Sequence, residues 1–208
     1  MLGIIPQNGR SDECLLAGKW AAPTYYDLRV HDRALAAEEL QTARLSLHRP
    51  ADVDIESIFA IHSDPETCLH NPSDALARFE EAEALYQCWD EQWRRCGYGY
   101  WVVRYRGSDQ QLGFCGIKPM DLGGMRVLNL FYRFATPAWG QGIASEAAAA
   151  VTKWAFRYLP EMPIIARARP ANIGSRRVAI KAGLSRAEHL DGIGYDGFDW
   201  IYAAKLPG

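Results

Sequence analysis

The 208-residue sequence lacks the features that direct a chain into a membrane or out of the cell. No apolar run approaches the roughly 18 residues that a membrane span needs. The first residues, MLGIIPQNGR, contain a short apolar patch broken by Pro6, and no basic segment precedes it, so they do not form a secretory signal. We therefore expect a cytoplasmic protein that does not associate with a membrane.

The sequence also lacks a cysteine pattern typical of disulfides or zinc. Its five cysteines are an odd number with scattered spacing, without a CxxC pair or a nearby histidine cluster. Reduced thiols and no metal are the simplest expectation. Cys115, in the apolar stretch LGFCGI, is expected to pack in the core as a small apolar side chain.

A strong charge of one sign is missing too. The net charge of -2 gives no general electrostatic reason to bind nucleic acid, so we expect no nucleic-acid partner and favour an acidic small molecule as the charged ligand. One segment keeps a nucleic-acid-associated factor open as an alternative. It is RARPANIGSRR, which contains Arg167, Arg169, Arg176 and Arg177.

The pattern of apolar residues divides the chain into an extension and one domain. Residues 1–40 are interrupted by prolines and glycines and show no sustained periodicity before HDRALAAEEL, where Asp32 is suited to cap a short helix. Further on, ARLSLHR alternates like a strand, and ADVDIESIFAIHSD carries apolar residues at near-helical spacing. We therefore expect an N-terminal extension over residues 1–40 and a domain over residues 41–208.

The rest of the domain predicts an α/β (α+β) fold with a mixed, mostly antiparallel central sheet. The amphipathic stretch SDALARFEEAEALYQCWDEQWRRC predicts a helix with Ser73 as its N-cap and Gly97 at its end. Three strand-like runs follow, YGYWVVRYR, QLGFCGIKPM and RVLNLFYRF, which predict an antiparallel meander. Helices over SEAAAAVTKWAFRYL and GSRRVAIKAG then alternate with strands over PIIARAR and FDWIYAAKL.

A glycine-rich loop leads from the strand RVLNLFYRF into the next helix. It reads Trp139-Gly140-Gln141-Gly142-Ile143-Ala144. Glycines let a ligand approach the backbone, and the unpaired N–H groups of the first helical turn carry the positive end of the helix dipole. Such a loop is suited to hold a phosphate, although glycines before a helix often serve only as turn residues.

The neighbours of these glycines exclude two common phosphate-binding motifs. No Lys-Ser or Lys-Thr pair follows them, so the Walker pattern fails. Ser145 stands where the dinucleotide-binding pattern has its third glycine. ATP and NAD are therefore disfavoured.

With this loop, the sequence resembles the GCN5-related N-acetyltransferases (GNAT), whose signature is Gln/Arg-x-x-Gly-x-Gly/Ala at the start of a helix after the fourth core strand. Trp139 replaces the usual Gln or Arg, as in the branch similar to the ribosomal-protein alanine N-acetyltransferases. The stretch LQTARLSLHRP resembles the opening strand of that branch, and PANIGSRRVAIKAGL resembles its Asn-x-x-Ser segment. The resemblance covers about residues 40–206.

The resemblance implies splayed parallel fourth and fifth strands, acetyl-CoA as co-substrate, and direct attack of a primary amine on the thioester in a ternary complex. The residues implied to bind CoA are Phe134, Ala135, Thr136, Trp139, Gly140, Gln141, Gly142, Ile143, Ala144, Ser145 and Asn172. An oxyanion-binding backbone N–H is implied near residues 131–134. Ser175 takes the place of the proton donor to the leaving thiolate, although a serine at a helix start also bonds local backbone without a catalytic role.

Several roles stay open. The acceptor is a protein N-terminus or a small amine, and a homodimer is possible. The alternative function is a CoA-binding regulatory module without turnover. Tyr132 faces either the acceptor or the core. The candidates for the general base are Asp121, Glu146, His189, Asp191, Asp196 and Asp199. The candidates for contact with the 3'-phosphate of CoA are Arg176, Arg177 and Lys181, which equally suit a solvated helix face.

Overall fold

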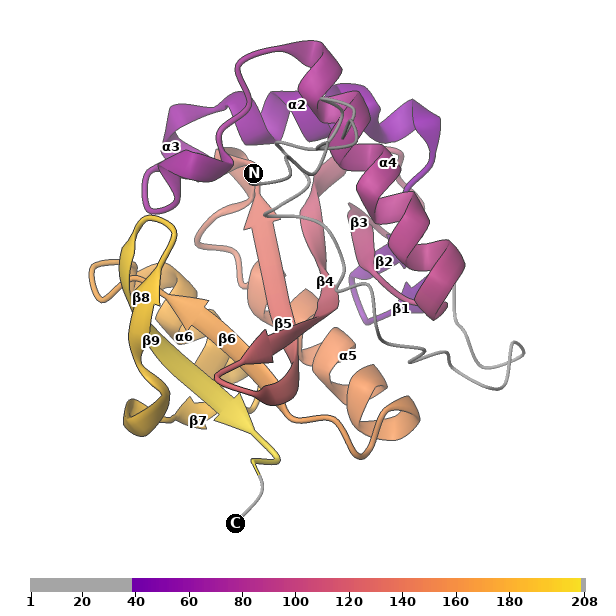
Figure 1. Ribbon diagram of the computed structural model, residues 1–208. Helices are drawn as coiled ribbons and strands as arrows, with labels where there is room; N and C mark the ends of the chain where they lie inside the picture. The colour runs from indigo at the N-terminus through magenta and orange to yellow at the C-terminus, as the bar shows by residue number, and fades with distance from the viewer. Residues whose placement is uncertain (1–38, 207–208) are drawn as a thin grey trace, which may run out of the picture.

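The computed structural model describes residues 39–206 (Figure 1). The short helix predicted around Asp32, and the predicted extension apart from residues 39 and 40, lie outside the described residues. The first described strand begins at Glu39, two residues before the predicted domain boundary, and pairs with the strand that follows it.

One sheet runs through the described part of the chain, in the order β1-β2-β3-β4-β5-β6-β9-β7, with β8 paired to β9. Its strands are β1 (Glu39–Gln41), β2 (Leu45–His48), β3 (Tyr100–Tyr105), β4 (Gln111–Leu122), β5 (Met125–Phe134), β6 (Ile164–Ala168), β7 (Ser185–Arg186), β8 (Gly192–Gly194) and β9 (Gly197–Ala204). The pair β5–β6 is parallel and the other pairs are antiparallel. The predicted mixed, mostly antiparallel sheet is confirmed.

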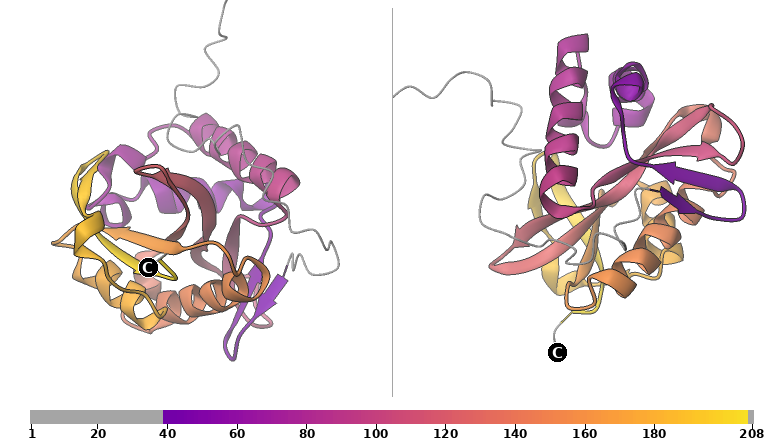
Figure 2. Two further views of the ribbon diagram at one scale, coloured as in Figure 1. Left: turned by 60° about the horizontal axis from the view of Figure 1, so that its bottom comes forward. Right: turned by 90° about the vertical axis from the view of Figure 1, so that its right-hand side faces the viewer.

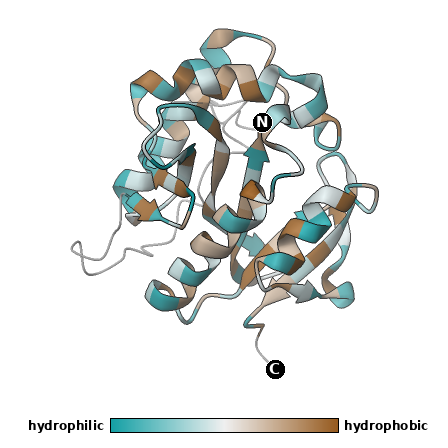
Figure 3. Cartoon of the chain, turned by 180° about the vertical axis from the view of Figure 1, so that it is seen from behind, coloured by the Kyte–Doolittle hydropathy of each residue, from teal (hydrophilic) through white to brown (hydrophobic). Residues whose placement is uncertain are grey.

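Helices cover both faces of this sheet (Figure 2). Their bounds are α2 (Ile55–Ser63), α3 (Pro65–Cys68), α4 (Phe79–Cys96), α5 (Ile143–Tyr158) and α6 (Ile173–Lys181), with short 3-10 turns η2 (Asp52–Asp54), η3 (Pro72–Asp74), η4 (Thr136–Ala138) and η5 (Glu188–Leu190). The longer helices carry both hydrophobic and hydrophilic stretches (Figure 3), as amphipathic helices on a sheet do. Helix α2 and most of the buried face of α4 pack around Tyr100 and Phe114, whereas α5 and α6 pack in the main core.

The structure corrects the predicted start of α4. Ser73 is not its N-cap but lies in the turn η3, and the helix begins at Phe79. Glu81 explains the later start, because its carboxylate accepts hydrogen bonds from the backbone N–H groups of Ala77 (2.7 Å) and Arg78 (3.1 Å). The predicted end of the helix is confirmed, with the residue after Cys96 in the left-handed conformation that favours glycine.

The parallel pair β5–β6 is held together only at its beginning. The register joins Leu128 with Ile164 and Asn129 with Ile165, and beyond these residues the two strands part. Strand β5 stays in regular register with β4 as far as Phe134, so the separation involves no bulge in that ladder. The splay implied by the family resemblance is confirmed, and it leaves one backbone edge of β5 unpaired.

Strands β3 and β4 approach each other closely at Gly116. A methyl group there would overlap the carbonyl oxygen of Gly99 and the Cα of Tyr100. We expect Gly116→Ala to lower the free energy of unfolding by about 3 kcal/mol, because backbone atoms must move to admit the new carbon. Urea unfolding monitored by tryptophan fluorescence measures the change. Gly192→Ala, with no atom within 4 Å of the added carbon, is the control and should stay within about 0.5 kcal/mol of wild type.

Candidate functional site

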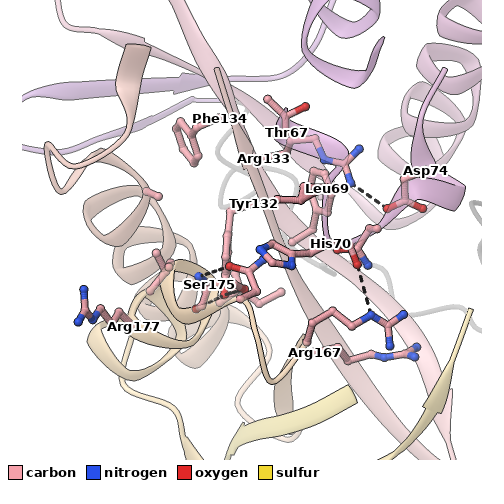
Figure 4. A pocket seen from close by; sticks show the side chains of 18 of the residues that line it. Thr67, Leu69, His70, Asp74, Tyr132, Arg133, Phe134, Arg167, Ser175 and Arg177 are labelled. Atoms are coloured by element: carbon pink, nitrogen blue, oxygen red, sulfur yellow. Dashed lines mark hydrogen bonds and ion pairs between the residues drawn. The ribbon is translucent and has the colours of Figure 1, made fainter. Parts of the chain in front are cut away.

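A cleft of about 1250 Å³ opens where β5 and β6 part (Figure 4). One wall is formed by β5, the glycine loop and the beginnings of α5 and α6. The other wall is formed by the α3–η3 segment, the region that follows β6, and the β8–β9 hairpin. Because these walls belong to opposite faces of the sheet, a ligand in the cleft can reach from one face to the other between the two strands.

The glycine loop forms one end of the cleft. Gly140 and Gly142 have φ angles of 75° and 77°, a conformation that other residues adopt only with strain. The N–H of Glu146 bonds the carbonyl of Gly142 at 3.0 Å and begins the helical ladder of α5. The N–H groups of residues 143–145 therefore have no acceptor within the helix and can bind an anion.

Most of the residues predicted to bind CoA line this cleft. They are Phe134, Trp139, Gly140, Gly142, Ile143, Ala144, Ser145 and Asn172, together with the predicted proton donor Ser175. Ala135, Thr136 and Gln141 are not among the lining residues. Gln141 instead braces the loop, since its Nε2 donates to the carbonyl of Pro137 (2.7 Å) and its Oε1 accepts from the Tyr105 hydroxyl (3.0 Å).

Trp139 fixes the strand end before the loop. Its indole Nε1–H donates to the carbonyl of Phe134 at 2.8 Å, while half of its surface remains exposed. Phe134 is one of the residues that the family resemblance implies to bind CoA. Because the N–H and the carbonyl of a strand residue point to the same side, the N–H of Phe134 is left as the group that faces a ligand.

Tyr132 lies beside Ser175 at the start of α6 (Figure 4). Asn172 is the N-cap, as its chemistry predicts, and its Oδ1 accepts from the N–H of Ser175 at 2.9 Å. The Tyr132 hydroxyl donates to the carbonyl of Ser175 (2.8 Å) and lies 3.0 Å from its Oγ. Tyr132 therefore lines the cleft beside Ser175, and burial raises the pKa of its phenol.

The region from residue 44 to residue 185, which carries these features, matches the family model of the acetyltransferase (GNAT) domain. The chain belongs to the GNAT acetyltransferase family. This match agrees with the resemblance found in the sequence and with the splayed strands. GNAT proteins use acetyl-CoA.

Individual proteins are similar to the chain in sequence or in fold. The uncharacterized protein YkkB of Bacillus subtilis (strain 168) is 29% identical over 156 residues, which cover 72% of this chain and 86% of that protein. An acetyltransferase from Agrobacterium tumefaciens superposes with a TM-score of 0.69 at 21% identity, over 81% of this chain and 94% of the other. RimL, a ribosomal L7/L12 α-N-protein acetyltransferase solved with coenzyme A, gives a TM-score of 0.65 at 16% identity, over 80% and 97%.

The candidate bases of this GNAT domain fall into two groups. Asp121, Asp196 and Asp199 line the cleft, whereas Glu146, His189 and Asp191 do not. Asp121 is partly occupied in a turn, where its Oδ1 accepts from the N–H of Gly124 at 2.9 Å. Three of the six candidates thus line the cleft, as do the carboxylates of Glu66 and Asp74, and the other three candidates are not cleft residues.

Ion pairs connect the residues that follow β6 to the β8–β9 hairpin. Asp199 of β9 contacts both Arg167 (Nε, 2.9 Å) and Arg169 (Nη1, 3.1 Å). Asp196, in the hairpin turn, accepts from the N–H (2.9 Å) and the hydroxyl (2.7 Å) of Ser73. The β8–β9 hairpin is therefore fastened to the η3 turn across the mouth of the cleft, a role of Ser73 that the sequence did not reveal.

Two further charged groups on this side went unnoticed in the sequence. Arg133 of β5 donates to Asp74 at 2.9 Å and forms part of the cleft wall (Figure 4). Lys118 of β4 also lines the cleft, and burial lowers its pKa to about 8. Alternation along β4 and β5 would have placed both on one face, but the sequence alone did not show that a cleft lies there.

Helix α6 carries the three candidates for contact with the 3'-phosphate of CoA, and two of them line the cleft. Arg177 and Lys181 line the cleft. Arg176 does not, because its guanidinium lies 4.5 Å from the ring centroid of Trp200 and donates to the Tyr202 hydroxyl at 3.2 Å. With Arg167 and Arg169 paired to Asp199 as well, the segment RARPANIGSRR does not present four free cations to nucleic acid.

The described residues contain neither a membrane-spanning helix nor a metal-binding cluster. Among residues 39–206, no helix is long and apolar enough to cross a membrane, and no group of three or more His, Cys, Asp or Glu side chains is placed to hold a metal ion. Cys115 is fully buried, and burial raises the pKa of its thiol, which confirms its predicted packing in the core.

His62 of α2 makes the free energy of unfolding depend on pH. It is fully buried, its Nδ1–H donates to the Ile58 carbonyl at 2.9 Å, and burial beside Arg133 lowers its pKa to about 3. Since the unfolded state takes up a proton below about pH 6.5 and the folded state does not, stability falls as pH drops from 6.5 toward 3, by up to about 1.4 kcal/mol per pH unit. We expect His62→Asn to be less stable at pH 7 but to show a shallower slope between pH 6.5 and 4.5 in urea unfolding. Equal slopes in the two proteins would contradict this assignment.

Proposed function

We propose that the protein transfers an acetyl group from acetyl-CoA to a primary amine by direct attack within a ternary complex. The observation that carries this proposal is the cleft itself, which joins an anion-binding helix start to the gap between two splayed parallel strands. The acyl donor enters along the glycine loop, and the amine approaches from the α3 and β8–β9 side. A protein N-terminus and a small amine both fit this opening as acceptor classes.

The gap between the strands supplies backbone donors for the oxyanion. The N–H of Leu128 bonds the carbonyl of Pro163 on the β6 side at 2.8 Å. By the alternation of the strand, the N–H groups of Tyr132 and Phe134 point to the same side, where β6 has moved away. A thioester carbonyl placed in the gap would receive one of these donors as negative charge develops.

Ser175 is the best-placed hydroxyl to protonate the leaving thiolate. The single proton of the Tyr132 hydroxyl goes to the Ser175 carbonyl, so the Ser175 hydroxyl is the donor in its 3.0 Å contact with the Tyr132 oxygen, and rotation about the Ser175 side chain would turn that proton toward a thiolate in the cleft. The raised pKa of Tyr132 keeps the phenol neutral at physiological pH. The serine hydroxyl therefore faces the ligand with a neutral polar group behind it.

The attacking amine must lose a proton on the other side of the cleft. An α-amine, with a pKa of about 8, reaches the neutral form more readily near pH 7 than a lysine, with a pKa of about 10.4. Of the candidate bases named in the sequence, Asp121, Asp196 and Asp199 line the cleft, which is also lined by the carboxylates of Glu66 and Asp74. Each is suited by type to accept the proton directly or through water.

Removal of the Ser175 hydroxyl tests its role. We expect Ser175→Ala to lower kcat by about 100-fold while leaving the KM for acetyl-CoA within about twofold, because a proton donor to the leaving group acts on the chemical step. Folding should be unaffected, since the cap bond from Asn172 uses the backbone N–H of residue 175. A KM effect without a kcat effect would instead assign the hydroxyl to binding.

A bulky side chain in the cradle tests CoA binding. Ser145 lines the cleft in the first turn of α5, and it avoids the positive φ that would strain any substitution of Gly142. We expect Ser145→Trp to weaken CoA binding by at least about 100-fold by calorimetry, because the indole fills the phosphate site. The matched control is Lys153→Trp, on an exposed position of the same helix, which should bind as wild type does.

Turnover distinguishes the enzyme from a silent CoA-binding module. Release of free thiol from acetyl-CoA is measured with a panel of amines and peptides that carry free N-termini. Turnover that is lost in Ser145→Trp and kept in Lys153→Trp supports the proposal. Tight CoA binding without turnover on the whole panel would support the regulatory module instead.

A further inference from the structure

A turn far from the glycine loop in sequence holds it from behind. Residues 42–44 connect β1 to β2, and their polar groups converge on Glu146 in the first turn of α5. The Glu146 carboxylate accepts from the Thr42 hydroxyl (2.5 Å), the Arg44 N–H (3.1 Å) and the Arg44 Nε (2.7 Å). The β1–β2 turn is thereby fastened to the start of the helix.

The same arginine also reaches the loop backbone. Its Nη1 donates to the carbonyl of Gln141 at 3.1 Å. Arg44 and Gln141 do not line the cleft, whereas Gly142 does. The guanidinium therefore lies on the side of the loop that faces away from the cleft.

This contact sets the direction of one backbone donor. In a trans peptide the C=O and the following N–H point in opposite directions, and the described residues contain no cis peptide bond. Because the carbonyl of Gln141 is drawn toward Arg44, the N–H of Gly142 points toward the cleft. Rotation of this peptide would present the carbonyl oxygen to the ligand and repel an anion.

Arg44 also offsets an unfavourable negative charge at the start of α5. Glu146 places a negative charge in the turn whose N–H groups are suited to bind phosphate. Its bonds to Thr42 and Arg44 hold the pKa of Glu146 below its usual value, so the carboxylate is charged at neutral pH. The guanidinium neutralises that charge from outside the cleft.

We infer that Arg44 is a positioning residue for the pyrophosphate of the acyl-CoA: it turns the Gly142 N–H toward the phosphates and cancels the charge of Glu146. The inference rests on the proposed function, since it takes the glycine loop as the CoA site. It assigns to Arg44 an action on the cofactor without contact with it. We therefore expect loss of Arg44 to weaken the binding of acyl-CoA and to leave kcat unchanged.

The test compares Arg44→Met with Arg44→Lys. We expect Arg44→Met to weaken CoA binding about tenfold by calorimetry and to raise the KM for acetyl-CoA by a similar factor, with kcat within twofold of wild type. Arg44→Lys keeps the charge, but a single ammonium cannot span both Glu146 and the Gln141 carbonyl, so it should still lose several-fold in affinity. Wild-type affinity in either variant would overturn the inference.

Two controls separate positioning from a general loss of structure. Arg106→Met removes a charge from an exposed position nearby, where the guanidinium makes only a 3.4 Å contact with the Thr42 carbonyl, and it should bind CoA as wild type does. Acetyl-pantetheine lacks the pyrophosphate, so its turnover should be equal in wild type and Arg44→Met. A loss with acetyl-pantetheine as large as that with acetyl-CoA would show structural damage and overturn the inference.

Failure of the proposed function gives a different result. If the wild-type protein neither binds CoA nor turns over acetyl-CoA, the proposed function fails. If the wild-type protein is active and all Arg44 variants match it, only the positioning role of Arg44 fails.

Discussion

The narrow joint between β5 and β6 determines the form of the rest of the site. Two residue pairs, Leu128 with Ile164 and Asn129 with Ile165, connect the strands before they part. On either side of this joint the sheet is continuous, because β5 pairs with β4 up to Phe134 and β6 pairs with β9 up to Ala168. The sheet consequently has two rigid halves with an opening between them, and unpaired backbone groups of β5 line that opening.

Each side of the opening has its own polar character. On the α5–α6 side, the available groups are backbone N–H groups and the hydroxyl of Ser175, which suit phosphates and a thioester. On the other side, Asp199 and Asp196 pair with Arg167 and Arg169, so that the formal charges of this cluster cancel. Asp196 also fastens the hairpin to Ser73. In the proposed reaction, the donor and the acceptor approach from opposite faces of the sheet and meet in the opening between β5 and β6.

Local patterns predicted the elements well, because alternation and helical spacing depend on neighbouring residues. The strands β3 to β6, the helix α5 and the cap at Asn172 all follow from such patterns. The start of α4 was wrong because Ser73 is drawn away by Asp196, which lies 123 residues later in the chain. Propensity at Ser73 could not reveal a partner that only the tertiary fold brings near.

The candidate site shows more clearly that local sequence patterns cannot predict contacts between distant elements. Glycine spacing and family resemblance located the loop, and most of the predicted residues line the cleft. The Trp139 bond to Phe134, the placing of Tyr132 beside Ser175 and the brace from Arg44 all join different elements, so no local pattern encodes them. Six candidate bases were equivalent in the sequence, and only the cleft separates three of them from the others.

The first turn of α5 illustrates how two local requirements conflict and are reconciled by the fold. An acidic residue near a helix N-terminus stabilises the helix by roughly 0.3–1 kcal/mol, so Glu146 favours α5 on its own. The same charge opposes an anion in the same turn. With Arg44 bonded to that carboxylate from the β1–β2 turn, the helix keeps its acidic residue and the cleft keeps a site that attracts phosphate. The β1–β2 hairpin at the edge of the sheet therefore supports the glycine loop as well as extending the sheet.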